Sequence, residues 1–201
     1  MSALSKEGEC GVKESDVTLV RRMQQKDPEA FDEIFERYHN RLLRMAYLIS
    51  GSYADSEDIV QETFIKCYCN CRELKDCSRF PSWLYQILTR TAWRYAKKSR
   101  REEPVEILFD ENFEGAVENP MDTALKNEEQ AVLWEAVSRL EIKQRTVVIL
   151  YYYNQLSTKE ISRVLGCMEG TVKSRLHTAR KNLEQSLNEE VQGWKKKSLT
   201  V

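Results

Sequence analysis

The sequence contains no run of apolar residues that approaches the ~20 needed to span a bilayer. Its first residues, MSALSKEGECGVKES, also lack the apolar segment of a secretory signal, so we expect a disordered leader over residues 1–15. With 201 residues, of which 41% are hydrophobic and 31% charged, the chain can form one large domain or two small ones. We therefore expect a cytoplasmic protein without direct insertion into a membrane.

The chain also lacks the residue patterns of common enzymes. It has no glycine-rich phosphate loop, and its two histidines, His39 and His177, belong to no Cys–His or Ser–His–Asp pattern. Its carboxylates follow helix-face spacing and form no separate set. We expect a protein that is not an enzyme and that needs no cofactor.

Cysteine is concentrated in one place, because CYCNCRELKDC, residues 67–77, holds four of the six cysteines. A metal site, a redox switch and simple core packing are the alternatives. On a predicted helix, Cys67 and Cys71 share one stripe, whereas Cys69 lies ~200° away, so these thiols do not converge on one tetrahedral ion. We expect no metal site and expect Cys67 and Cys71 to pack as small hydrophobic residues. A redox role for the cluster stays open.

Positive and negative charges are segregated behind a net charge of −1. Residues 78–101 include seven basic residues and no acidic one, whereas residues 102–122 include eight acidic residues and no basic one. Residues 157–183 are basic again, with six basic and two acidic residues. This pattern indicates two polyanion-binding units joined by a flexible acidic linker. Solvated helix faces are the simpler alternative for the two basic blocks.

Helical periodicity dominates the chain. Asp27 is predicted to cap a helix whose first residue is Pro28 and whose C-cap is Gly51. The apolar face of this helix comprises Phe31, Ile34, Phe35, Tyr38, Leu42, Met45, Ala46 and Ile49. We expect further helices over about residues 54–71 and from about residue 80 onward.

One segment favours a different structure by propensity alone. VVILYYY, residues 147–153, is β-branched and aromatic, which is typical of a strand. No second strand is predicted nearby, and an isolated strand is not stable. We therefore expect a buried helix here and an all-α fold for the whole chain.

The predicted helix at residues 54–71 has a second stripe opposite its apolar one. This stripe combines carboxylates with apolar groups and comprises Asp58, Gln61, Glu62, Ile65 and Cys69. Since the core of the helix does not need this face, we expect it to contact a partner protein.

The strongest local signal is LSTKEISRVLGCMEGTVKSRLHTARKNL, residues 156–183. Ser157 and Glu160 have the spacing of a capping box, and Gly166 supplies the turn between two helices. The inner side of the second helix comprises Val172, Leu176, Ala179 and Leu183. Its outer side is basic, which is typical of a helix-turn-helix whose second helix enters the major groove. A helical hairpin with a solvated face is the alternative.

The basic block at residues 79–101, RFPSWLYQILTRTAWRYAKKSRR, interleaves aromatic rings with cations. We expect Leu84 and Leu88 to face inward, which leaves Arg90 and Trp93 outside. Rings and cations together are typical of surfaces that bind single-stranded nucleic acid, on which each stacked base contributes ~1–3 kcal/mol. Each tryptophan taken singly is better explained as a core residue, but the combination with a run free of acidic residues favours strand binding.

Three of these segments together resemble the extracytoplasmic-function sigma factors of bacterial RNA polymerase. DSEDIVQETFIKCY, FPSWLYQI and the helix-turn-helix are similar to that family's core-binding helix, promoter-melting helix and C-terminal DNA-binding unit, in the same order. The resemblance implies two small helical domains and no catalysis. The implied organisation is sigma region 2 at 16–101, an acidic linker at 102–122, sigma region 4 at 123–187 and a basic tail at 188–201.

The resemblance also implies partners and site residues. The partners are the β′ clamp helices and β flap of the polymerase core, promoter DNA and an anti-sigma factor. Together with the spare helix face, it predicts that the core is bound by Asp58, Gln61, Glu62 and Ile65. Melted minus-ten DNA is expected to contact Arg72, Lys75, Arg79, Phe80, Trp83, Arg90, Trp93, Arg94 and Lys97. Duplex minus-thirty-five DNA is expected to contact Thr171, Lys173, Ser174, Arg175, His177, Thr178, Arg180 and Lys181.

The chain departs from the family pattern in three places. Arg90 and Arg94 stand where the family commonly has Asn and Asp, so base-specific roles are not carried over to them. Met168 replaces the usual Ser or Thr at the N-cap of the recognition helix, a loss of ~1 kcal/mol. The cysteine-rich loop is also unusual. The alternative function is a dimeric helix-turn-helix regulator that acts on duplex operators without polymerase, although it leaves the aromatic basic helix unexplained.

Overall fold

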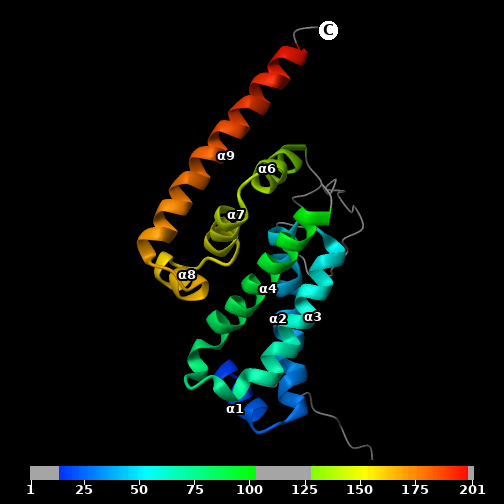
Figure 1. Cartoon of the computed structure of the whole chain (residues 1–201), viewed down its shortest axis with the longest axis vertical. Helices are drawn as coiled ribbons and strands as arrows, with labels where there is room; N and C mark the ends of the chain where they lie inside the picture. The colour runs from blue at the N-terminus through cyan, green and yellow to red at the C-terminus, as the bar shows by residue number, and fades with distance from the viewer. Residues whose placement is uncertain (1–13, 103–127, 199–201) are drawn as a thin grey trace, which may run out of the picture.

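The computed structural model describes residues 14–102 and 128–198, and these ranges contain helices and no strand (Figure 1). The all-α prediction is therefore confirmed for the described residues. The predicted leader lies outside them up to residue 13, as do residues 103–122 of the predicted acidic linker. None of the described helices combines the length and hydrophobicity needed to cross a membrane.

The N-terminal unit is a bundle of α1 (Asp16–Gln24), α2 (Pro28–Ser50), α3 (Tyr53–Asn70) and α4 (Phe80–Glu102). The predicted ends of α2 are confirmed. The Asp27 side chain accepts from the backbone N–H of Glu29 at 3.0 Å, and Gly51 adopts the left-handed conformation, with φ of 80°, that ends the helix. The core of the bundle includes Leu19, Ile34, Leu42, Met45, Ile59, Phe64, Leu84 and Leu88.

The predicted apolar face of α2 is confirmed over most of its length but is wrong at its N-terminal end. Ile34 and Tyr38 are buried, whereas Phe31 is only half-buried and Phe35 is 38% exposed. The reason is that α3 covers this end of α2 incompletely, so the two rings line a surface groove instead of the core.

Two short 3₁₀ turns connect α3 to α4, namely η1 (Cys71–Glu73) and η2 (Cys77–Arg79). Cys67 and Cys71 pack in the core as predicted, since they are 0% and 2% exposed, and Cys77, for which the sequence predicted no environment, is buried as well. Burial raises the pKa of the Cys67 thiol to about 12, and the neighbouring Cys71 adds to the shift. A thiol with so high a pKa is a weak nucleophile, since the thiolate is the reactive form.

The C-terminal unit comprises α6 (Glu128–Ser138), α7 (Ile142–Val148), η3 (Ile149–Tyr153), α8 (Thr158–Leu165) and α9 (Glu169–Ser198). The prediction of a helix at VVILYYY is confirmed, with one turn of π-helix at η3. The predicted burial is confirmed for residues 147–150, which include the core residues Val147 and Leu150, but is wrong at Tyr152, which is 54% exposed. Helix α9 is longer than the recognition helix alone, and it continues through the predicted basic tail to Ser198 (Figure 1).

The two units pack against each other, with α8 beside α4 and α7 beside α2. The indole Nε1 of Trp93 donates to Thr146 Oγ1 at 2.9 Å, and the rings of Tyr47 and Trp134 stack with centroids 5.6 Å apart. Core residues of both units belong to one continuous hydrophobic cluster. The sequence predicted a tethered second module, and the structure shows that module docked on the first.

Candidate functional site

The outer face of α3 is exposed, as the sequence predicted. Ser52 caps this helix by accepting from the Asp55 N–H at 3.2 Å. The inner stripe, which includes Ile59 and Cys67, fills the core. The outer stripe of predicted polymerase contacts stays at the surface and comprises Asp58, Gln61, Glu62 and Ile65, of which Glu62 is half-buried. This face is available to a partner.

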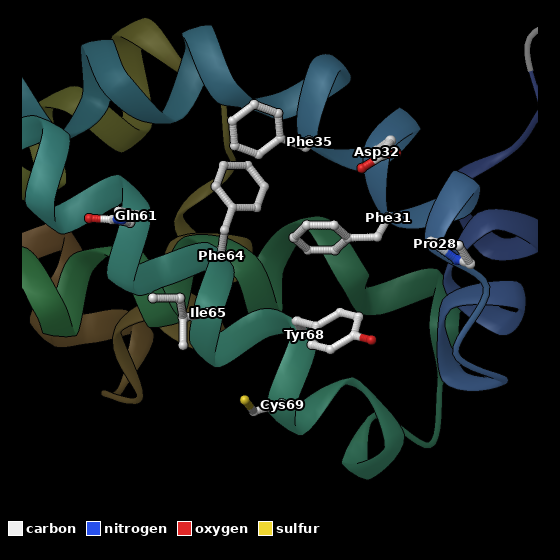
Figure 2. A pocket seen from close by; sticks show the side chains of 9 residues that line it. All are labelled: Pro28, Phe31, Asp32, Phe35, Gln61, Phe64, Ile65, Tyr68 and Cys69. Carbon is white, nitrogen blue, oxygen red and sulfur yellow. The ribbon is translucent and has the colours of Figure 1, made fainter.

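An apolar groove adjoins this face between α2 and α3 (Figure 2). Its floor consists of aromatic rings in contact: Phe35 lies 4.7 Å from Phe64, and Phe31 lies 5.2 Å from Tyr68, between centroids. Ile65 is 56% exposed and lines the groove as well. A partner that contacts the outer stripe of α3 can therefore bury apolar side chains next to it. Helical spacing predicted Phe31 and Phe35 on the apolar core face of α2 and gave no sign of this groove.

Glu62 links the outer face of α3 to helix α4. Its carboxylate pairs with Lys66 at 2.6 Å and with the Arg94 guanidinium of α4. Burial raises the pKa of Glu62, but the hydrogen bonds from Lys66 and Arg94 lower it by more, so the pKa lies below its ordinary value. A predicted polymerase contact and a predicted DNA contact are thus joined in one ion pair.

The predicted strand-binding residues of α4 differ in exposure. Arg90, Arg94 and Lys97 are exposed, as expected. Trp93 is half-buried and faces the C-terminal unit through its bond to Thr146, which corrects the expectation that it points outward.

Phe80 requires a clearer correction. Its side chain is 0% exposed and packs against Tyr38 at 5.7 Å between ring centroids, because α4 begins at this residue and turns it into the bundle. Phe80 is therefore a core residue and offers no surface to a base. Trp83 is half-buried beside it, at 6.1 Å.

The loop before α4 exposes the other three predicted strand contacts, Arg72, Lys75 and Arg79. Asp76 organises its second half: its carboxylate accepts from the Ser78 N–H at 3.1 Å and pairs with Arg79 Nε at 3.1 Å. These hydrogen bonds, that from the Ser78 hydroxyl first, lower the pKa of Asp76. The loop is therefore held in a defined conformation.

The helix-turn-helix forms as predicted. Ser157 Oγ accepts from the Glu160 N–H at 3.3 Å while the Glu160 carboxylate accepts from the Ser157 N–H at 2.8 Å, so the capping box is confirmed. These contacts lower the pKa of Glu160. Gly166, with φ of 63°, makes the turn, and the predicted inner residues of α9 pack inward, with Leu183 half-buried.

Most predicted duplex contacts lie on the outer side of α9. Those exposed are Lys173, Ser174, His177, Thr178, Arg180 and Lys181, while Thr171 and Arg175 are half-buried. Arg180 also has a structural role, since its Nε donates to the Tyr152 hydroxyl at 2.9 Å and its guanidinium lies over the Tyr151 ring. At the start of α9, Met168 is 79% exposed, and the Glu169 carboxylate accepts from Thr158 of α8 at 2.8 Å.

Comparison with known proteins decides the family. Residues 34–102 match Sigma-70 region 2, and residues 130–183 match Sigma-70, region 4. The chain is 31% identical over 183 residues to the ECF RNA polymerase sigma-E factor of Haemophilus influenzae, a match that covers 86% of this chain and 95% of that protein. The Escherichia coli sigma-E factor is also 31% identical over 183 residues, and this match covers 86% of this chain and 94% of that protein. The chain belongs to the ECF sigma factors.

Solved structures share the fold of this sigma factor. CnrH, solved in complex with the cytosolic domain of CnrY, superposes with a TM-score of 0.65 at 21% identity, covering 88% of this chain and 99% of that one. RpoE of Bartonella quintana, solved with the anti-sigma factor NepR, gives 0.63 at 22% identity, covering 79% and 96%. The chain is therefore an alternative sigma factor that directs transcription initiation at promoters, and the family to which it belongs consists of non-catalytic initiation factors. The family thereby decides against the operator-binding regulator that the sequence left as an alternative.

Sequence reasoning missed contacts between distant segments of the sigma factor. Gln24 of α1 binds the loop before α4 at two carbonyl oxygens, and no local pattern marks it. The aromatic groove was also missed. Phe35 lies three residues before Tyr38, which is buried, yet Phe35 itself is exposed. Its exposure depends on how much of α2 is covered by α3, and helical spacing within α2 does not reveal this.

Proposed function

We propose that this sigma factor binds the β′ clamp helices of polymerase core through the outer face of α3 and the adjoining aromatic groove. The observation that carries the proposal is the exposure of Asp58, Gln61 and Ile65 on a helix whose opposite stripe fills the core. Carboxylate and amide groups beside an apolar groove match a partner helix that presents both cations and apolar side chains. Glu62 lies on the same face and completes this polymerase-binding surface.

In the same proposal, melted minus-ten DNA binds to the N-terminal unit. The loop at residues 71–79 captures a flipped base, and the exposed cations of α4, Arg90, Arg94 and Lys97, hold the strand. Support comes from their exposure and from the absence of any acidic residue between residues 78 and 101. Trp83 and Trp93 contribute ring surface only where they are not covered by their present contacts.

The C-terminal unit is proposed to bind the minus-thirty-five element as duplex and to contact the β flap. Helix α9 presents its outer face, with Lys173, His177 and Lys181, to the major groove. Arg175 and Arg180 flank it and contact phosphates, which fix register. The proposed limits are region 2 at 16–101 and region 4 at 123–187, joined by the linker at 102–122. An anti-sigma factor is the proposed regulator, since RpoE was solved with the anti-sigma factor NepR and CnrH was solved with a partner protein, the cytosolic domain of CnrY.

Gel filtration with purified core polymerase tests the proposed polymerase-binding face. We expect the wild-type chain to co-elute with core and Asp58→Ala and Ile65→Ala to co-elute less. Glu184→Ala, which removes an exposed carboxylate from α9, serves as the charge-matched control and should co-elute as wild type does. Undiminished co-elution of both α3 variants would show that core binds elsewhere.

A further inference from the structure

One side chain, that of Gln24 at the end of α1, fastens the loop between α3 and α4. Its Nε2 donates to the carbonyl oxygen of Cys71 at 2.8 Å and to that of Leu74 at 2.9 Å. Its Oε1 lies 3.8 Å from the Cys77 thiol, which donates to it. A single glutamine therefore contacts the beginning, the middle and the far end of the loop.

The loop in turn satisfies the end of α1. The last carbonyl oxygens of a helix have no partner within the helix. Here the carbonyl oxygen of Gln24 accepts from Arg72 Nε at 3.0 Å. Contacts run in both directions, so the course of the loop depends on α1.

The residues between these fixed points face solvent. Glu73, Lys75 and Asp76 are exposed, whereas Cys71 and Cys77 on either side are buried. The loop thus presents a short exposed segment on an anchored backbone. Such a segment suits the recognition of a flipped base, which is recognised through hydrogen bonds to its edge.

We propose that Gln24 is a positioning residue that determines which minus-ten base this loop accepts. The inference rests on the proposed function of the loop and adds a residue from a different helix to it. Hydrogen bonds weaken steeply when distance or angle departs from the optimum, so base discrimination requires a loop backbone fixed within about 0.5 Å. Gln24 is half-buried, and its amide group is directed at the loop, so it acts through the loop rather than by contacting DNA.

The test uses holoenzyme assembled from polymerase core and the full chain. Gln24→Met keeps the length of the side chain and removes both N–H donors. Initiation is measured on promoters that carry each of the four bases at each minus-ten position. We expect the ratio between the preferred base and the others to fall about tenfold, the equivalent of ~1.4 kcal/mol, because the two hydrogen bonds that hold the loop backbone are lost. Affinity for core and for minus-thirty-five duplex should stay unchanged.

Two further variants support the interpretation. Gln25→Met changes the neighbouring glutamine, whose side chain is exposed, and should retain the wild-type ratio. Gln24→Lys supplies an ammonium group that can donate to the same two carbonyl oxygens and should restore discrimination. If Gln24→Met does not fold, Gln24→Lys still tests whether donors at this position determine the base preference.

Several results would overturn the proposal. They are an unchanged ratio in Gln24→Met, an equal loss of initiation with every base, or a Gln24→Lys variant that folds and does not discriminate. If wild-type holoenzyme itself shows no base preference in the minus-ten element, the proposed function of the loop fails as well. A wild-type preference that Gln24→Met fully retains removes the role of Gln24 alone.

Discussion

Helices α4 and α9 carry the two basic surfaces of this sigma factor, but they differ in how far those surfaces are engaged. On α4, Arg94 pairs with Glu62 and the Trp93 indole donates to Thr146. Arg90 also approaches the C-terminal unit. Its Nη2 lies close to Gly166, at 3.8 Å from the position that a Cβ atom on this glycine would occupy. Part of the predicted DNA-binding surface of helix α4 therefore contacts other residues of the protein.

Helix α9 is organised differently. His177, Thr178 and Lys181 are exposed, and the ion pair of Lys173 joins it to Glu169, one turn earlier on the same helix, at 2.8 Å. Duplex DNA can therefore reach this face without a change in packing between the two units.

The difference follows from what each helix is proposed to bind. A duplex is the stable form of promoter DNA and can be met by a preformed surface, whereas a single strand exists only after the duplex opens. Each contact on α4 is worth only ~0.5–1.5 kcal/mol, so polymerase and DNA together can replace it. We therefore expect α9 to act as a preformed surface and α4 to become available during initiation.

The largest expected effect is on stability, and it distinguishes a residue on the buried side of α4 from an exposed neighbour. Phe80→Ala should lower the free energy of unfolding by ~3–5 kcal/mol, because a fully buried ring is replaced by a methyl group. Chemical denaturation measures this change. Arg79→Ala, at the exposed neighbouring position, should alter stability by less than ~0.5 kcal/mol. Unchanged stability of Phe80→Ala together with impaired strand opening would return Phe80 to the DNA-binding surface.

Much of the fold could be predicted because its signals are local. The caps at Asp27, Gly51 and Ser157 depend on residue types within one turn, and the structure confirms each of them. The opposite stripes of α3 follow from helical spacing, which the structure also confirms. Such features are set by a few consecutive residues, so sequence alone reveals them.

The remaining features depend on contacts across the chain. Trp93 meets Thr146, which is 53 positions away, and Gln24 meets Cys71 over a similar separation. Phe80 was assigned to DNA because its segment is basic, yet the surrounding charge does not determine which way the first residue of a helix points. The predicted exposure therefore holds for the strand-binding cations and fails most clearly for the aromatic residues, which suit a core as well as a DNA surface.

The next effect concerns the preformed surface of α9. Arg175→Ala should weaken binding to minus-thirty-five duplexes of any sequence by ~1–2 kcal/mol, because a charged contact to phosphate is lost. The slope of log affinity against log salt concentration should become shallower by about 1. Titration of a labelled duplex at several salt concentrations measures both, with Arg139→Ala as a charge-matched control. A change that depends on base sequence would instead assign Arg175 to base recognition.

A smaller effect is expected where α4 meets the C-terminal unit. Thr146→Val removes the acceptor of the Trp93 indole and preserves the shape of the side chain. If docking competes with strand binding, affinity of the free sigma factor for a minus-ten single strand should rise by up to about fivefold, the equivalent of ~1 kcal/mol. Thr89→Val, which removes a hydroxyl that donates within α4, is the matched control and should leave affinity unchanged. Equal affinities in wild type and Thr146→Val would show that the docked unit does not limit access to α4.

The smallest effect tests the ion pair between Glu62 and Arg94. Since the pKa of Glu62 in the folded protein lies below its ordinary value of 4.5, the pair stabilises the fold above that pH and loses its contribution as pH falls through the folded pKa. Glu62→Gln should therefore cost up to ~1 kcal/mol at neutral pH, and its difference from wild type should shrink under acid conditions. Denaturation at a series of pH values measures it, with Glu57→Gln, an exposed carboxylate on the same helix, as control. In an Arg94→Ala background the effect of Glu62→Gln should be reduced, because one of the two cations that lower this pKa is gone. A full effect in that background would assign the stabilisation to Lys66 and would separate the proposed polymerase-binding face of α3 from the proposed DNA-binding surface of α4.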